Sequence, residues 1–214
     1  NDDLSVMECR KYGPRIGGRK FAAVGEIYHS HDGKRGSLMR HAGYPAWKVI
    51  GLECTGWWGG ANNGVYTVAD SEHFLFNTPE KIDWSDRVTF GHAPGGGFPR
   101  AGGHEGDARL SSFAAPVESI PEHGFIPNEP AGIQTIAKIE RKNSRAQDYF
   151  ARWVKAKNAT LVDMIYWERP NGGRVFHAGA IAFGWTLGID PKQAALMRNV
   201  LHRFGVTATK PKIP

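Results

Sequence analysis

The 214-residue sequence is poor in cysteine and contains no long apolar run. Its 2 cysteines, Cys9 and Cys54, are too few for a disulfide framework, which favours a reducing compartment. No stretch approaches the roughly 18 consecutive apolar residues of a membrane span, and no signal peptide is recognisable. We therefore predict a cytoplasmic protein that has no membrane partner.

The sequence also lacks the local motifs of several enzyme classes. It has no Gly-x-Ser-x-Gly segment, so nothing indicates a serine hydrolase. Gly95-Gly-Gly97 is not followed by Gly-Lys-Ser/Thr or by a helix start, so neither a P-loop nor a dinucleotide site is indicated. The formal net charge is +6, but lysine and arginine are scattered and form no block of five. This distribution favours a solvated basic surface, and we expect no nucleic-acid partner.

The clearest structural signals lie near the C-terminal end. An apolar run, 161–167, predicts a buried strand, and Asn171-Gly172 predicts a tight turn into a second strand over 175–183. The second strand contains three consecutive small residues, which indicate that another backbone packs close to it: Ala178, Gly179 and Ala180.

A capped helix is predicted to follow this hairpin. Asp190 is its expected N-cap, with Pro191 at the first helical position and Gln193 as the capping-box partner. Gly205 is expected to end the helix. The predicted apolar face is formed by Met197, Val200, Leu201 and Phe204.

The rest of the chain indicates one α/β domain, 1–214, with a loop-rich insertion at 54–130 that holds most of the glycine and proline. Strands are predicted at 4–9, 21–28, 47–53, 65–70, 73–76 and 133–139, and a helix after residue 144. The chain begins at Asn1 inside a predicted strand, so we expect it to be part of a longer polypeptide.

Two histidine-containing segments carry residues that could support chemistry. In His29-Ser-His31 the imidazoles alternate on an extended segment and could share a metal, although a polar turn is the more common use of this pattern. His104, Glu105 and Asp107 lie in a Gly-rich stretch, 91–109. Glu105 could act as a general base there if it is desolvated; the alternative is a surface loop.

Two further features could have either a structural or a functional role. Glu8 continues the apolar face of the first predicted strand, either at a solvated strand end or pointing into a site. A lone carboxylate is a poor metal site, because such sites need two or three ligands. Trp57-Trp58 could stack on a sugar or a base, but a core or cleft wall is the more common role.

Several segments together resemble the C-terminal part of the large (beta) subunit of N,N-dimethylformamidase. Ser5-Val-Met-Glu-Cys-Arg10 is similar to the family's Glu-x-Arg strand, and the run 25–45 is similar to its Gly-Glu-x-Tyr-His-Ser segment and the glycines after it. The strand 175–185 and the helix segment 198–201 resemble the family's final strand and its Arg-Asn-Val-Leu helix. The resemblance covers both ends of the chain and is thin between residues 54 and 130.

This resemblance implies a glutamine-amidotransferase-like, flavodoxin-like α/β fold that hydrolyses the C–N bond of a small amide. It implies a mononuclear iron held by a glutamate and two tyrosines, with Glu8 as the ligand in this chain and the others upstream of residue 1. The segment 102–109, which contains His104, resembles an acidic loop near the family's site, but its acids are shifted, so the acidic role is open between Glu105 and Asp107. Our hypothesis for the catalytic residues is Glu105 with His104 and His29, in which His29 holds or polarises the substrate. The expected partners are the small amide, a small subunit, further copies of the chain and the upstream polypeptide.

Two other functions stay open. One is a binding module without catalysis, in which Trp-rich basic loops bind a carbohydrate or an acidic partner. The other is a metallohydrolase built on His29, His31 and His104.

Overall fold

The computed structural model describes residues 15–16, 19–20, 45–58, 64–112, 128–140 and 160–206; the side chains of 15–16, 19–20, 54–58, 104 and 160–161 are outside the description. The helices are α1 (Trp47–Ile50), α2 (Pro191–Arg203) and the 3-10 turns η2 (Phe74–Phe76), η3 (Pro94–Gly96), η4 (Leu110–Ser112) and η6 (Ile181–Thr186). The strands are β1 (Arg15–Ile16), β2 (Arg19–Lys20), β3 (Glu53–Trp58), β4 (Tyr66–Val68), β5 (Thr89–Phe90), β6 (His104–Ala108), β7 (Gln134–Glu140), β8 (Thr160–Glu168) and β9 (Arg174–His177).

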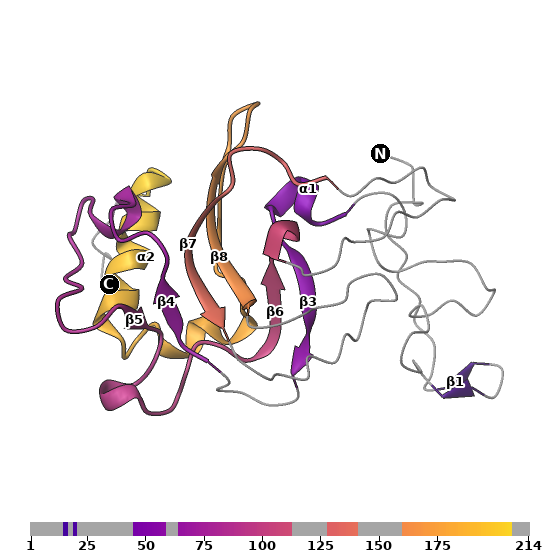
Figure 1. Cartoon of the computed structure of the whole chain (residues 1–214), viewed down its shortest axis with the longest axis horizontal. Coiled ribbons are helices and arrows are strands. Elements are labelled where there is room, and N and C mark those ends of the chain that lie inside the picture. The colour runs from indigo at the N-terminus through magenta and orange to yellow at the C-terminus, as the bar shows by residue number, and fades with distance from the viewer. Residues whose placement is uncertain are drawn as a thin grey trace, which may run out of the picture.

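A five-stranded sheet in the order β5-β4-β7-β8-β9 forms the centre of the described structure. Every pairing in it is antiparallel. Helix α2 lies on one side of this sheet, and the two-stranded sheet β3-β6 lies on the other (Figure 1). The fold thus combines helices with antiparallel strands. This mixed helix and strand content agrees with the broad α/β class predicted from the sequence.

The predicted strand–turn–strand near the C-terminus is confirmed as β8 and β9. Arg169 and Gly173 close the turn through a backbone hydrogen bond of 3.0 Å, and Gly172 and Gly173 adopt positive φ angles of 80° and 85°. The second strand is shorter than predicted: it ends at His177, and the chain then enters η6.

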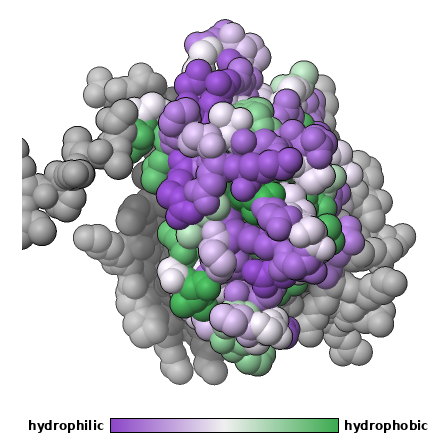
Figure 2. Space-filling view, turned by 90° about the vertical axis from the view of Figure 1, so that its left-hand side faces the viewer, coloured by the Kyte–Doolittle hydropathy of each residue, from purple (hydrophilic) through white to green (hydrophobic). Residues whose placement is uncertain are grey.

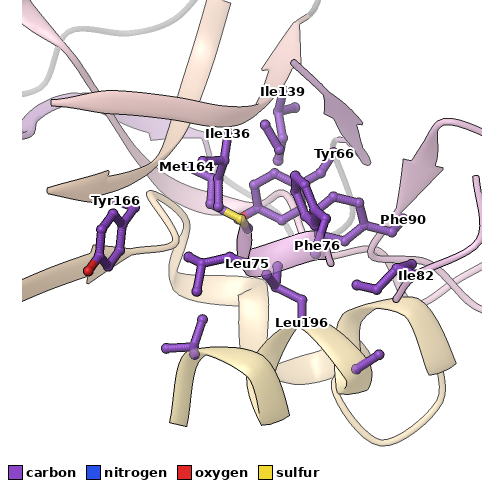
Figure 3. Packing of buried hydrophobic residues seen from close by; sticks show 14 of the residues in the cluster. Tyr66, Leu75, Phe76, Ile82, Phe90, Ile136, Ile139, Met164, Tyr166 and Leu196 are labelled. Carbon is purple, nitrogen blue, oxygen red and sulfur yellow. The ribbon is translucent and has the colours of Figure 1, made fainter. Parts of the chain in front are cut away.

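Both faces of β8 are buried, which explains its continuous apolar sequence. Met164 and Tyr166 contribute to the main core beneath α2, together with Tyr66, Phe76, Phe90 and Leu196 (Figure 3). Ile165 and Trp167 face the opposite side and pack with Leu52 and Ile133. Burying each of these large side chains stabilises the fold by about 2 kcal/mol.

The capping of α2 agrees with the sequence in part. Asp190 accepts a hydrogen bond from the backbone N–H of Lys192 at 3.0 Å, and Pro191 takes the first helical position as predicted. The capping-box prediction for Gln193 is wrong. Its side chain is fully buried and bonds the hydroxyl of Thr186 and the carbonyl of Phe183, while the Asp190 N–H donates to the carbonyl of Thr186.

The apolar face predicted for α2 also needs correction. Val200 is buried, but Leu201 is 44% exposed and Phe204 is 40% exposed. The buried positions include Asn199, whose side chain donates to the carbonyls of Leu75 and Glu80 at 2.8 and 2.7 Å. A buried asparagine is therefore part of the helix face that packs inward, because it satisfies backbone groups of a loop that packs on the helix. Seen from the α2 side, the surface is mostly hydrophilic with scattered apolar residues (Figure 2).

Three local predictions between residues 47 and 76 are wrong. Residues 47–50 form α1 instead of a strand, and Gly51 ends the helix with a positive φ of 82°. Residues 54–58, expected as loop, belong to β3, and 73–76 form a 3-10 turn instead of a strand. The range 54–130 also supplies β4 and β5 to the main sheet. In the described ranges, no helix is long and apolar enough to cross a membrane.

Candidate functional site

The carboxylates that the sequence singles out near residue 105 lie on a strand instead of a loop. β6 pairs antiparallel with β3, and on its other side Gly106 forms a bridge with Ala180. Glu105 and Asp107 are two residues apart in β6, so their side chains leave the same face of the strand. The strand therefore holds both acids in a defined position between β3 and the segment that follows β9.

Asp107 is the most perturbed acid of this group. Burial first, and then the negative charges of Glu105 and Glu53, raise the pKa of its carboxyl to about 7. The side chain is still 25% exposed. Glu53, at the start of β3, is only 6% exposed. Asp107 therefore exists in both protonation states near neutral pH.

His177, the last residue of β9, faces Asp107. Its Nε2 lies 3.8 Å from Oδ2 of Asp107, and its Nδ1 accepts a hydrogen bond of 2.9 Å from the backbone N–H of Gly179. Because Nδ1 is an acceptor, the proton of the neutral ring is on Nε2 and points toward the carboxyl. Burial lowers the pKa of His177, so the neutral form dominates at physiological pH.

Close backbone approach brings the two strands to this distance. The N–H of Asp107 donates to the carbonyl of Gly179 at 2.7 Å. A Cβ at Gly179 would lie 2.3 Å from the carbonyl oxygen of Asp163, and the residue has a φ of +74°. Only glycine fits here, which confirms the prediction that another backbone packs against the small residues 178–180.

A buried tyrosine, Tyr66, lies close to Asp107. The ring is fully buried, and its hydroxyl donates to the carbonyl of Ala178 at 2.7 Å. Burial, and then the charge of Asp107, raise the pKa of this phenol. Tyr66 therefore stays protonated and holds the segment that follows His177.

A second polar group flanks β6 at its C-terminal end. The Asp163 carboxylate is fully buried and accepts a hydrogen bond of 2.9 Å from the backbone N–H of Arg109. The guanidinium of Arg109 makes two hydrogen bonds to Glu129, at 3.0 and 2.7 Å. This pairing lowers the pKa of Glu129 against the effect of its burial. These contacts fix β6 against β7 and β8 and leave no unpaired charge on Arg109.

The residues predicted from sequence are only partly brought together. Glu105 lies in the cluster with Asp107, whereas His104 is on β6 at a position whose side chain is outside the description. Glu8, the predicted iron ligand, and His29 lie outside the described residues, so their predicted roles stay predictions. His177 lies in the strand predicted over 175–183 but is not among the site residues predicted from sequence.

Sequence reasoning missed Glu53. It was assigned to the end of an expected strand, 47–53, and it has no charged neighbour in the sequence that would mark it. Its effect on Asp107 arises because β3 and β6 are adjacent, although the two residues are far apart in the chain.

Within the described side chains, no group of three or more histidine, cysteine, aspartate or glutamate residues is placed to hold a metal ion. Three hollows of the described surface lie away from Asp107 and His177. Comparison of the chain with protein-family models gives no match, and comparison with curated proteins gives no significant match.

Proposed function

We propose that this chain carries the proton-transfer site of a hydrolase that cleaves the C–N bond of a small amide, with Asp107 as the acid and base. The observation that carries the proposal is the raised pKa of Asp107, about 7, beside the neutral imidazole of His177. A catalytic acid or base works best when its pKa is near the working pH. Strongly shifted carboxyls of this kind are concentrated at functional sites.

The proposed step needs only water as co-reactant. Ionised Asp107 takes a proton from water while the water oxygen bonds to the amide carbon. Protonated Asp107 then gives that proton to the amide nitrogen as the C–N bond breaks. The products are a carboxylic acid and an amine, and no electrons are exchanged with another reagent.

His177 and Glu105 have supporting roles in this proposal. The Nε2–H of His177 would stabilise ionised Asp107 if the 3.8 Å separation shortened by about 1 Å on substrate binding. Glu105 keeps the pKa of Asp107 high by its negative charge. The negative surroundings disfavour anionic substrates and favour a neutral amide and a protonated amine product.

The resemblance to the N,N-dimethylformamidase family, which covers both ends of the chain, supports the amide as substrate; the segment 102–109 adds a likeness to that family's acidic loop, with its acids shifted. Of the two acids in this segment, we assign the acid–base role to Asp107. The amidotransferase-like layout is also part of the proposal. A flavodoxin-like sheet is mostly parallel, and all described pairings are antiparallel, so that layout would need strands from outside the described residues.

Iron is part of the proposal only through Glu8 and ligands upstream of residue 1. The described residues do not fit such a centre, because none of their carboxylate and imidazole groups is arranged to hold a metal ion.

The test is release of dimethylamine from N,N-dimethylformamide by the full-length protein. Asp107→Asn is expected to lower kcat at least about 100-fold with little change in KM. The matched control is Asp86→Asn, which removes an exposed carboxylate on the loop before β5 and is expected to retain activity. Full activity of Asp107→Asn would refute the proposal, and substrate binding without turnover in the unmodified protein would favour a binding module.

A further inference from the structure

A single peptide group, between Ala178 and Gly179, connects the buried Tyr66 with His177. Its carbonyl oxygen accepts the hydrogen bond of 2.7 Å from the Tyr66 hydroxyl. Its N–H donates to Nδ1 of His177 at 2.9 Å. The C=O and N–H of a planar trans peptide point in opposite directions, so a bond that fixes the carbonyl also fixes the direction of the N–H. The hydroxyl of Tyr66 therefore acts on His177 through this one group.

Tyr66 brings its hydroxyl to this peptide from a firmly packed position. The ring is fully buried, stacks on Phe90 with 5.1 Å between the ring centres, and lies nearly perpendicular to Phe183 at 6.1 Å. Burial raises the pKa of the phenol, so the hydroxyl remains a donor. One bond further along the chain, the carbonyl of Gly179 accepts the N–H of Asp107 at 2.7 Å. The peptide thus lies between a rigid donor in the core and the strand that carries the acid.

The direction of this peptide decides where the neutral imidazole of His177 carries its proton. A neutral imidazole has one N–H, and its place follows from the partner of the other nitrogen. With the Gly179 N–H at Nδ1, the proton is on Nε2, 3.8 Å from Oδ2 of Asp107. A peptide turned the other way would present the Ala178 carbonyl to Nδ1, and the proton would then be on Nδ1. Because glycine has a wide choice of backbone angles, the selection depends on the bonds that the peptide makes.

We propose that Tyr66 is a positioning residue of the Asp107 site and sets the tautomer of His177 through the Ala178–Gly179 peptide. The phenol stabilises only the direction in which the Ala178 carbonyl points to it, and the polarised peptide is a stronger donor at its N–H. The catalytic meaning of this arrangement rests on the proposed function. The Nε2–H favours ionised Asp107, which takes the proton from water, whereas the other tautomer would favour the protonated acid.

The test is Tyr66→Phe in the full-length protein with isotope-labelled histidine, because the NMR shifts of the ring nitrogens identify the one that carries the proton. The variant removes the hydroxyl and keeps the ring against Phe90. The signals of His177 are identified by their loss in His177→Gln. At about pH 8, the ratio of the Nε2–H form to the Nδ1–H form is expected to fall at least about tenfold, because the Ala178 carbonyl has lost its donor.

The titration of the Asp107 carboxyl, followed by its carbon NMR signal, is the second measurement. The titratable groups that act on this carboxyl or face it are Glu105 of β6, Glu53 of β3, Tyr66 of β4 and His177 of β9. Loss of the selected tautomer is expected to move the Asp107 midpoint upward by about 0.5–1 pH unit, the shift that one hydrogen bond of ordinary strength gives. The rise of kcat/KM with pH should move in the same direction.

Tyr166→Phe is the matched control, since it removes a hydroxyl from the second buried tyrosine of the same core, which donates to Glu168 at 2.7 Å. It is expected to leave the His177 tautomer and the Asp107 midpoint unchanged. Equal changes in both variants would show a general loosening of the core and overturn the proposal, as would an unchanged tautomer ratio in Tyr66→Phe. Changes confined to Tyr66→Phe, in a protein that does not hydrolyse amides, would support the role of Tyr66 and refute the proposed function.

Discussion

Replacing Asp107 by asparagine is expected to stabilise the fold at about pH 8 and to have little effect at about pH 4. The pKa of the folded carboxyl, about 7, is above its ordinary value of 3.8. Between these values the folded state holds a proton that the unfolded state has lost. Stability from this group is therefore fully present below about pH 4, and it is lost as the pH rises through about 7.

The size of the effect follows from the same difference. A pKa that changes from 3.8 to about 7 corresponds to about 4 kcal/mol of unfolding free energy. Because the side chain is 25% exposed, water screens part of the repulsion, and about 2–4 kcal/mol is expected. For a protein of this size that is about 5–15 °C in the melting temperature. Asparagine cannot ionise, so it should recover this stability at high pH.

The assay is urea unfolding of both proteins at several pH values between about 4 and 8.5. The lowered pKa of His177 opposes the Asp107 effect, because an imidazole that stays neutral in the fold loses stability as the pH falls below 6.5. Taking the difference between the two proteins at each pH removes this contribution to first order. A difference that does not grow between about pH 5 and 8, or an asparagine variant that is less stable at pH 8, would refute the assigned pKa.

Three other changes test the same region and the core. Glu105→Gln removes a negative charge near Asp107 and should lower the pKa of Asp107. The rise of kcat/KM with pH should therefore move to lower pH. An unchanged pH dependence of kcat/KM would exclude this coupling. Gly179→Ala should cost more than about 3 kcal/mol in urea unfolding because its Cβ meets a carbonyl of β8 at 2.3 Å, whereas Gly184→Ala, with open space around it, should change stability by less than about 1 kcal/mol. Asn199→Ala should lower the unfolding free energy by about 2–4 kcal/mol, because the buried carbonyl of Leu75 and the part-buried carbonyl of Glu80 lose their donor. A value near zero would contradict this account of α2.

Local sequence signals predicted the C-terminal part of the fold well. Asn171-Gly172 marked the turn between β8 and β9, and Asp190-Pro191 marked the start of α2. These signals depend on backbone preferences and on side chains a few residues away, so one segment of sequence contains them. β7 was also predicted, within one residue at each end.

The same reasoning failed where tertiary contacts override local preference. Residues 47–50 have a strand-like composition but form α1, where Trp47 is fully buried and its indole donates to the carbonyl of Asn128. The Gly-rich stretch around residue 104 was expected as a loop, yet it forms β6 because β3 and the segment at Gly179 supply backbone partners on both sides. No pattern inside either segment contains that information.

The sequence by itself determined the turns, the capped helix, the buried strand β8 and the need for small residues at 178–180. Only the tertiary structure decided that Glu53, Glu105, Asp107 and His177 gather at one place. The physical reason is that a pKa depends on burial and on charges within a few ångströms, and these neighbours come from three strands far apart in the chain. The tertiary structure therefore singles out Asp107 as the acid with the raised pKa, whereas the sequence had favoured its neighbour Glu105.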